Sequence, residues 1–131
     1  MIILDTAPWI WWVSDPGRLS RRARRAIVAG EKSEDLLVSA VSVWEVALKQ
    51  GLRKLALDRE FRSWIALASV YPGIRLAPVE ASDSLESALL PGKVHRDPAD
   101  RFIIALSRRL GAPIVTSDRL IRDYEHVETI W

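Results

Sequence analysis

The chain has 131 residues, of which 49% are hydrophobic and 27% charged, a composition typical of soluble globular proteins. A chain of this length can bury one core, so we expect a single domain over residues 1–131. The sequence contains no cysteine, which excludes disulfides and cysteine-ligated zinc and fits a cytoplasmic protein. Asp5 interrupts the apolar start and no basic segment precedes it, so we expect neither a secretory signal nor a membrane span.

Alternating strand and helix patterns run along the whole chain. Apolar or β-branched runs predict strands at residues 2–4, 36–39, 74–78, 114–116 and 127–131. Helical patterns that stop before Gly or Pro occupy residues 19–29, 43–50, 59–70, 82–90 and 98–110, with Gly30, Gly51 and Gly111 as helix ends. This alternation predicts an α/β fold, with a mainly parallel sheet of four to five strands flanked by helices.

Two segments near the start of the chain each allow two interpretations. Trp9, Trp11 and Trp12 belong to a helix that is apolar on nearly all sides and must be buried, either in the core or against a second copy or a partner. Five arginines fall within eight residues, at positions 18, 21, 22, 24 and 25. They form either a solvated helix face or a surface that contacts phosphates or a partner, and a net charge of +2 does not decide between these.

Four acidic residues occupy places where a parallel sheet exposes its carboxyl edge. Asp5 and Asp118 follow predicted strands, whereas Glu45 and Asp100 lie in the first turns of predicted helices. Right-handed crossovers bring strand ends and helix starts to one edge, and ligands bind there in open α/β sheets. The four carboxylates are therefore expected to converge.

Each acid also has a purely structural interpretation. Residues 42–45 read as a capping box from Ser42 to Glu45. Asp97 precedes Pro98 as an N-cap would, and Asp118 could cap the last helix.

The joint pattern nevertheless favours a metal site. Carboxylates in one pocket repel one another unless cations bind, and an oxygen-only set prefers Mg²⁺ or Mn²⁺. Such a site suits hydrolysis of phosphodiesters.

Three segments in this order, LDTAPWIWWVSD, SAVSVWEVALKQGLRKLAL and HRDPADRFIIALSRRLGAPIVTSDRLI, resemble PIN-domain toxins of the VapC type. The resemblance spans nearly the whole chain and implies a Rossmann-like sheet in a metal-dependent endoribonuclease. Such an enzyme would use metal-activated water, leave a 3′-hydroxyl and a 5′-phosphate, and be inhibited by a cognate antitoxin. From the residues themselves we expect a homodimer, formed in part by the tryptophan-rich surface, and no nucleotide cofactor.

The site residues carry over from the resemblance by position. Asp5, Glu45, Asp100 and Asp118 match the family's four catalytic and metal-binding acids. The supporting positions are Thr6, Asp97, Thr116 and Ser117, of which Asp97 is better read as a helix cap. The basic residues that we expect to contact RNA or antitoxin are Arg21, Arg22, Arg25 and Lys49. The chain departs from the family at Ala7 and Ala99, where relatives often have a polar and an aromatic residue, but all four acids are present.

Other classes fit less well. A haloacid-dehalogenase-type phosphatase needs a second aspartate where Ala7 stands, and a response-regulator receiver needs a late lysine where Ser117 and Asp118 stand. No glycine-rich turn follows the first strand, which excludes a dinucleotide-binding oxidoreductase. The remaining alternative is a catalytically inactive PIN-like module that binds RNA or protein. We expect His95 to be a loop residue rather than a general base.

Overall fold

The computed structural model describes residues 1–94 and 96–131, so His95 lies outside the described residues. Five short strands form one sheet: β1 (Ile2–Leu4), β2 (Leu36–Ser39), β3 (Ile74–Ala77), β4 (Ile114–Val115) and β5 (Thr129–Ile130). Their order is β3-β2-β1-β4-β5, and every neighbouring pair is parallel. The expected parallel α/β sheet is thus confirmed, with β1 at its centre.

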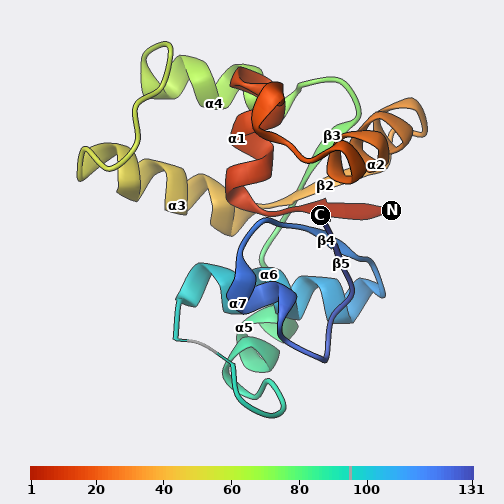
Figure 1. Ribbon diagram of the computed structural model, residues 1–131. Helices are drawn as coiled ribbons and strands as arrows, with labels where there is room; N and C mark the ends of the chain where they lie inside the picture. Colours follow the sequence, from red (N-terminus) through yellow and green to blue (C-terminus); the bar gives the residue numbers. More distant parts are fainter. Residues whose placement is uncertain (95) are drawn as a thin grey trace.

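Helices cover both faces of this sheet (Figure 1). One face carries α1 (Thr6–Ser14), the short helix η1 (Pro16–Arg18), α2 (Arg21–Lys32), α3 (Ala40–Gly51) and α4 (Phe61–Ser69). The other carries α5 (Ala81–Ala88), α6 (Pro98–Leu110) and α7 (Arg119–Arg122). No helix in the described part of the chain has the length and apolar character that a membrane crossing requires.

The tryptophan-rich helix α1 belongs largely to the core. Trp9 is fully buried, meets Trp64 of α4 edge-on with ring centroids 5.1 Å apart, and donates its indole N–H to the Ala68 carbonyl at 3.2 Å. Trp11 and Trp12 are only partly buried against the same cluster. Trp9 is therefore a core residue and is excluded from an interface role.

Helix α3 begins earlier than the sequence predicts. The chain passes directly from β2 into Ala40, and Ser39 caps the helix by accepting the Val41 N–H at 3.2 Å. The predicted capping box from Ser42 to Glu45 is wrong, because both residues lie inside the helix and Ser42 instead accepts the Thr6 hydroxyl at 2.9 Å. Glu45 consequently lies in the second turn and is not a capping residue.

The three glycines predicted as helix ends behave differently. Gly51 is the last residue of α3, but Leu52 rather than the glycine caps the helix. Gly111 ends α6 in the left-handed conformation, with φ of 62°, as predicted. The prediction for Gly30 is wrong, because α2 continues to Lys32. Gly30 is buried, and a Cβ there would collide with the Leu36 side chain, so this glycine serves close packing of α2 on β2.

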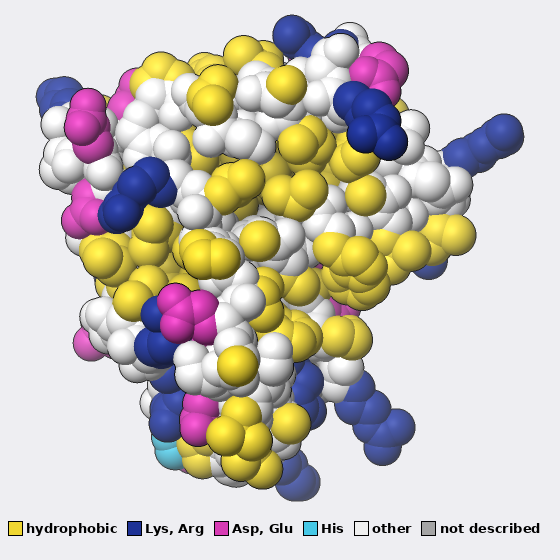
Figure 2. Space-filling model, turned by 180° about the vertical axis from the view of Figure 1, so that it is seen from behind, with side chains coloured by type: hydrophobic (Ala, Val, Ile, Leu, Met, Phe, Trp, Pro, Cys, Tyr) yellow, Lys and Arg dark blue, Asp and Glu magenta, His cyan; other side chains and the backbone are white. Residues whose placement is uncertain are grey.

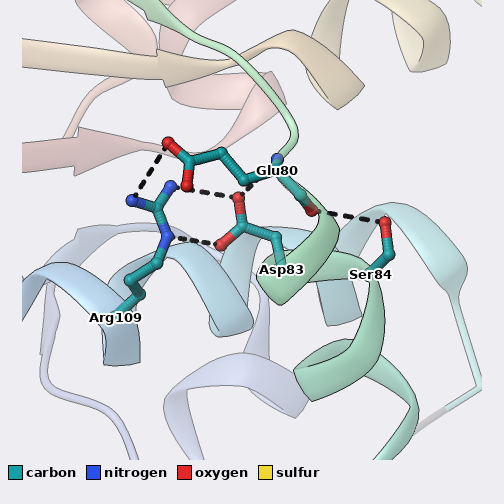
Figure 3. A network of polar contacts seen from close by, with 4 residues as sticks. All are labelled: Glu80, Asp83, Ser84 and Arg109. Atoms are coloured by element: carbon teal, nitrogen blue, oxygen red, sulfur yellow. Dashed lines mark hydrogen bonds and ion pairs between the residues drawn. The ribbon is translucent and has the colours of Figure 1, made fainter.

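An ion network around the buried Asp83 joins helices α5 and α6 (Figure 3). The Arg109 guanidinium donates to both carboxylate oxygens of Asp83, at 2.7 and 3.0 Å, and lies 3.6 Å from Glu80. Asp83 is only 2% exposed and also accepts the Glu80 N–H at 3.0 Å. Burial alone would raise the pKa of Asp83, but the hydrogen bonds from Arg109 and Glu80 and the Arg109 charge lower it below its usual range.

Candidate active site

Asp5 stands at the carboxyl end of the central strand and starts α1. Its Oδ1 accepts the Thr6 N–H at 2.8 Å, so the carboxylate caps the helix, and its Oδ2 accepts the Thr116 hydroxyl at 2.7 Å. Its backbone N–H donates to the Val115 carbonyl at 3.0 Å. Asp5 is only 6% exposed, so neutral donors from two strand ends hold a nearly buried carboxylate in one orientation.

The loop after β4 places a second acid beside the first. Thr116 is fully buried, and while its hydroxyl donates to Asp5 it accepts the Asp118 N–H at 3.0 Å. The Asp118 carboxylate accepts the Leu120 N–H at 2.8 Å and caps α7, as predicted. A single threonine thus couples the two strand-end aspartates across neighbouring strands.

Three further carboxylates come together from α3 and α6. Single carboxylate oxygens of Glu45, Asp97 and Asp100 all lie within 4.8 Å of one another. Asp97 caps α6 by accepting the Asp100 N–H at 3.1 Å, which confirms its predicted capping role, but its carboxylate also belongs to this group. Sequence reasoning assigned Asp97 only a supporting place, because cap chemistry alone accounts for an aspartate before Pro98.

The crowding of negative charge raises the pKa of two of these acids. Burial, followed by the charges of Asp5, Asp97, Asp118 and Glu45, raises the pKa of Asp100 to about 8. Burial also raises the pKa of Asp5 to about 6, against the lowering hydrogen bonds from Thr116 and Thr6 and with smaller contributions from Glu45 and Asp118. A bound cation would relieve both effects, since it favours the ionised form of every carboxylate near it.

All four predicted acids line one pocket of about 350 Å³ at the carboxyl edge of the sheet. The described residues around it also include Thr6, Asp97, Ser117 and Lys49 from the predicted set, with Ala7 and Trp11 in addition. Thr116 lies beneath the pocket through its contact with Asp5. The structure therefore brings the predicted acids together, and Trp11 is a wall residue that the sequence did not mark as part of the site.

The predicted basic contacts fall into two places. Lys49 lies in the pocket wall, with its ammonium 3.3 Å from a Glu45 carboxylate oxygen. Arg21, Arg22 and Arg25 are exposed on α2, and none of the three is among the described residues that line the pocket. Only the lysine is adjacent to the carboxylates.

Comparison with known families and structures agrees with this architecture. Residues 2–127 match the PIN domain family, so the chain belongs to the PIN-domain family. It is similar along almost its whole length to Ribonuclease VapC22 of Mycobacterium tuberculosis, with 31% identity over 132 residues that cover 99% of this chain and 98% of the relative.

Solved structures show the same fold at lower identity. VapBC2 from Rickettsia felis, solved bound to a promoter DNA fragment, matches with a TM-score of 0.70 and 14% identity, covering 98% of this chain and 97% of that chain. FitAcB from Neisseria gonorrhoeae matches with a TM-score of 0.62 and 23% identity, covering 98% and 96%.

Proposed function

We propose that this protein is a metal-dependent endoribonuclease of the VapC type, a toxin that hydrolyses RNA phosphodiester bonds and is inhibited by a cognate antitoxin. One observation carries the proposal. Carboxylates from the ends of β1 and β4, the second turn of α3 and the start of α6 line one pocket, in a chain 31% identical to a protein named as a ribonuclease.

The donor set fits a hard divalent cation. Asp5, Glu45, Asp100 and Asp118 would hold Mg²⁺ or Mn²⁺, and Asp97 joins them because its oxygen lies within 4.8 Å of those of Glu45 and Asp100. Every one of these ligands is a carboxylate oxygen, the donor type that both ions prefer. A divalent ion supplies phosphate binding, a lower pKa for water and stabilisation of the departing oxygen at such a site.

The residues of the chain position this ligand set. Thr116 and the Thr6 N–H hold the Asp5 carboxylate in place, and Thr116 also fixes the backbone before α7 through the Asp118 N–H. Thr6 is held in turn by its hydrogen bond to Ser42 on α3. Lys49 adds a positive charge at the rim, where it would attract an RNA phosphate as the carboxylates become neutralised.

The partner part of the proposal rests on exposed apolar surface. Leu48 on α3 and Leu52, the residue that caps the C-terminus of this helix, are 45% and 58% exposed. Figure 2 shows hydrophobic side chains gathered over the rear face of the molecule, with lysines and arginines around the rim. Exposed apolar groups of this kind are typical of interaction surfaces, and we assign them to the antitoxin and to a homodimer in the cytoplasm.

Cleavage of total RNA by the purified protein tests the enzymatic part. We expect cutting with Mg²⁺ or Mn²⁺ that stops with chelator and leaves a 5′-phosphate and a 3′-hydroxyl at each mapped end. Asp5→Asn and Asp100→Asn should each lose at least about a thousandfold in rate, or about 4 kcal/mol in the activation barrier. The matched control is Asp58→Asn, which changes an exposed loop carboxylate outside the pocket and should cut normally.

Two outcomes would contradict this assignment. Folded, antitoxin-free protein that cuts nothing with either metal would leave the inactive RNA- or protein-binding module as the function. Asp5→Asn and Asp100→Asn proteins that cut as well as wild type would assign the carboxylates to helix capping alone. For the partner, Leu52→Asp should weaken inhibition by the antitoxin while metal-dependent cutting stays unchanged.

A further inference from the structure

Next to the acidic pocket, three segments that are far apart in the sequence form one aromatic and cationic stack. The Arg18 guanidinium of η1 lies 4.5 Å from the ring centroid of Trp11. Trp131 also packs against Trp11, with ring centroids 5.9 Å apart and ring planes tilted by 53°. The separation between Arg18 and Trp11 is within the range of a cation–π interaction.

The fold places this stack at the functional edge of the sheet. Trp11 is itself a wall residue of the pocket that Asp5, Glu45 and Asp100 line. Trp131 directly follows β5, and Ile130 accepts the N–H of Thr116, the residue that holds Asp5. The stack is therefore continuous with the wall of the carboxylate pocket.

The stack also presents what a nucleobase binds. Trp11 and Trp131 are only partly buried and Arg18 is exposed, so aromatic and guanidinium surface remains open to solvent. Within residues 1–94 and 96–131, no carboxylate forms an ion pair with Arg18, and its charge is not neutralised within that part of the chain. Aromatic rings and arginine planes are the surfaces on which unpaired RNA bases stack.

We propose that Trp11, Arg18 and Trp131 form a base-stacking subsite that binds an unpaired nucleotide next to the phosphate held in the carboxylate pocket. This inference rests on the proposed ribonuclease function. It assigns RNA rather than protein to this surface, because the stack shares its central residue, Trp11, with the pocket and carries a positive charge. The subsite would favour substrates with a base free to leave its helix at the position beside the cleaved bond.

Binding of two labelled probes tests the subsite without cleavage, with Ca²⁺ in place of Mg²⁺ so that a cation offsets the carboxylate charge, and recovery of intact probe shows that no cutting has occurred. One probe is a single-stranded 12-nucleotide RNA of mixed sequence, and the other is an abasic ribose-phosphate chain of equal length. Wild type should bind the base-bearing probe about tenfold more tightly, as expected for stacking of one base. Trp11→Ala should bring this ratio close to one while affinity for the abasic chain stays unchanged, and Arg18→Ala should weaken binding of both probes.

The matched control is Trp44→Ala, which removes a half-exposed tryptophan that lies outside the described pocket wall. It should keep the wild-type ratio. Should Trp11→Ala fail to fold by circular dichroism, Trp131→Ala makes the same test at the residue that follows β5. A wild-type ratio near one, or a ratio unchanged in folded Trp11→Ala and Trp131→Ala, overturns the subsite. A change from dimer to monomer in these variants with the RNA ratio intact would assign the surface to protein instead.

Metal-dependent cleavage measured on the same preparations separates the two proposals. Wild type that cuts RNA but shows no preference for bases refutes the subsite and leaves the nuclease standing. Wild type that prefers bases but never cuts refutes the nuclease and leaves a subsite for RNA in a binding module.

Discussion

Two groups of buried carboxylates in this molecule have opposite electrostatic surroundings. Asp83 on α5 receives a two-pronged hydrogen bond from Arg109, and its pKa is lowered. Asp100 on α6 is surrounded by four other acids, and its pKa is raised to about 8. Burial acts in the same direction at both sites, so the difference comes from the neighbours. The first arrangement stabilises a fold, whereas the second stores electrostatic repulsion that a bound cation relieves.

The largest expected effect is on activity in the acidic pocket. Glu45→Gln should reduce metal-dependent RNA cleavage by at least about a thousandfold, because it removes one charged ligand while keeping the shape of the side chain. The free energy of unfolding, measured by urea titration in chelator, should not fall. If Glu45→Gln cleaves RNA normally, or if it is strongly destabilised, Glu45 has a structural role like that of Asp83.

The ion network should show the reverse pattern. Asp83→Ala leaves Arg109 without its main partner between α5 and α6 and should lower the free energy of unfolding by about 3 kcal/mol. Cleavage per folded molecule should be retained at low temperature, because Asp83 does not line the acidic pocket. Glu80→Gln is the control: it removes the charge 3.6 Å from Arg109 but keeps a side-chain oxygen that can cap α5, and it should cost under about 0.5 kcal/mol. Loss of cleavage in folded Asp83→Ala would remove the distinction between the two regions.

The pH dependence of stability should sharpen the comparison. The pKa values of about 6 for Asp5 and about 8 for Asp100 lie above the ordinary 3.8, so the folded protein binds protons more tightly than the unfolded chain. The stability they contribute is present below about pH 4 and is lost as the pH rises through 6 and 8. In chelator we expect the free energy of unfolding to fall by several kcal/mol over this interval, since each pKa unit corresponds to about 1.4 kcal/mol.

Two comparisons check this pH effect. Asp100→Asn should flatten the decline, because the amide does not ionise. Excess Mg²⁺ or Mn²⁺ should stabilise wild type more at pH 8 than at pH 5. If the stability of the metal-free protein instead rises from pH 5 to pH 8, the negative charges of Asp5 and Asp100 must be balanced by neighbouring groups, as Arg109 balances that of Asp83.

The smallest effect is expected at the rim. Lys49 is half exposed, and its ion pair with Glu45 should contribute under about 0.5 kcal/mol to stability. If Lys49 contacts an RNA phosphate, Lys49→Met should raise KM a few-fold. It should also lower the slope of log KM against the logarithm of the salt concentration by about one. Lys54→Met, on the loop after α3 and outside the described pocket wall, is the control. Equal salt dependence in wild type and Lys49→Met would exclude this contact.

The sheet and the four acids could be predicted because they depend on local signals and one topological rule. Asp5 and Asp118 follow apolar strands, and parallel strands joined by helices must expose their ends at one edge. The start of α3 was mispredicted, since Ser39 and Ser42 are equally good caps and only the tight passage out of β2 selects Ser39. The end of α2 was wrongly predicted at Gly30, because this glycine is required by a tertiary contact with Leu36 and not by a helix end.

Two features had no local signal in the sequence. The pairing of Asp83 with Arg109 depends on how α5 packs on α6, which no spacing rule specifies. The stack of Trp11, Arg18 and Trp131 joins opposite ends of the chain through β5. The sequence allowed either a core or an interface role for Trp11. Only the structure, in which Trp11 and Asp5 line the same pocket, identifies it as a pocket residue.

The central place of β1 has a consequence for synthesis on the ribosome. Asp5 is synthesised 111 residues before its partner Thr116, which follows a strand that pairs directly with β1. Chains emerge from the N-terminus, and a parallel strand pair of this separation forms only when the later strand is available. The carboxylate pocket therefore cannot be assembled during synthesis until the segment that carries Thr116 and Asp118 has emerged.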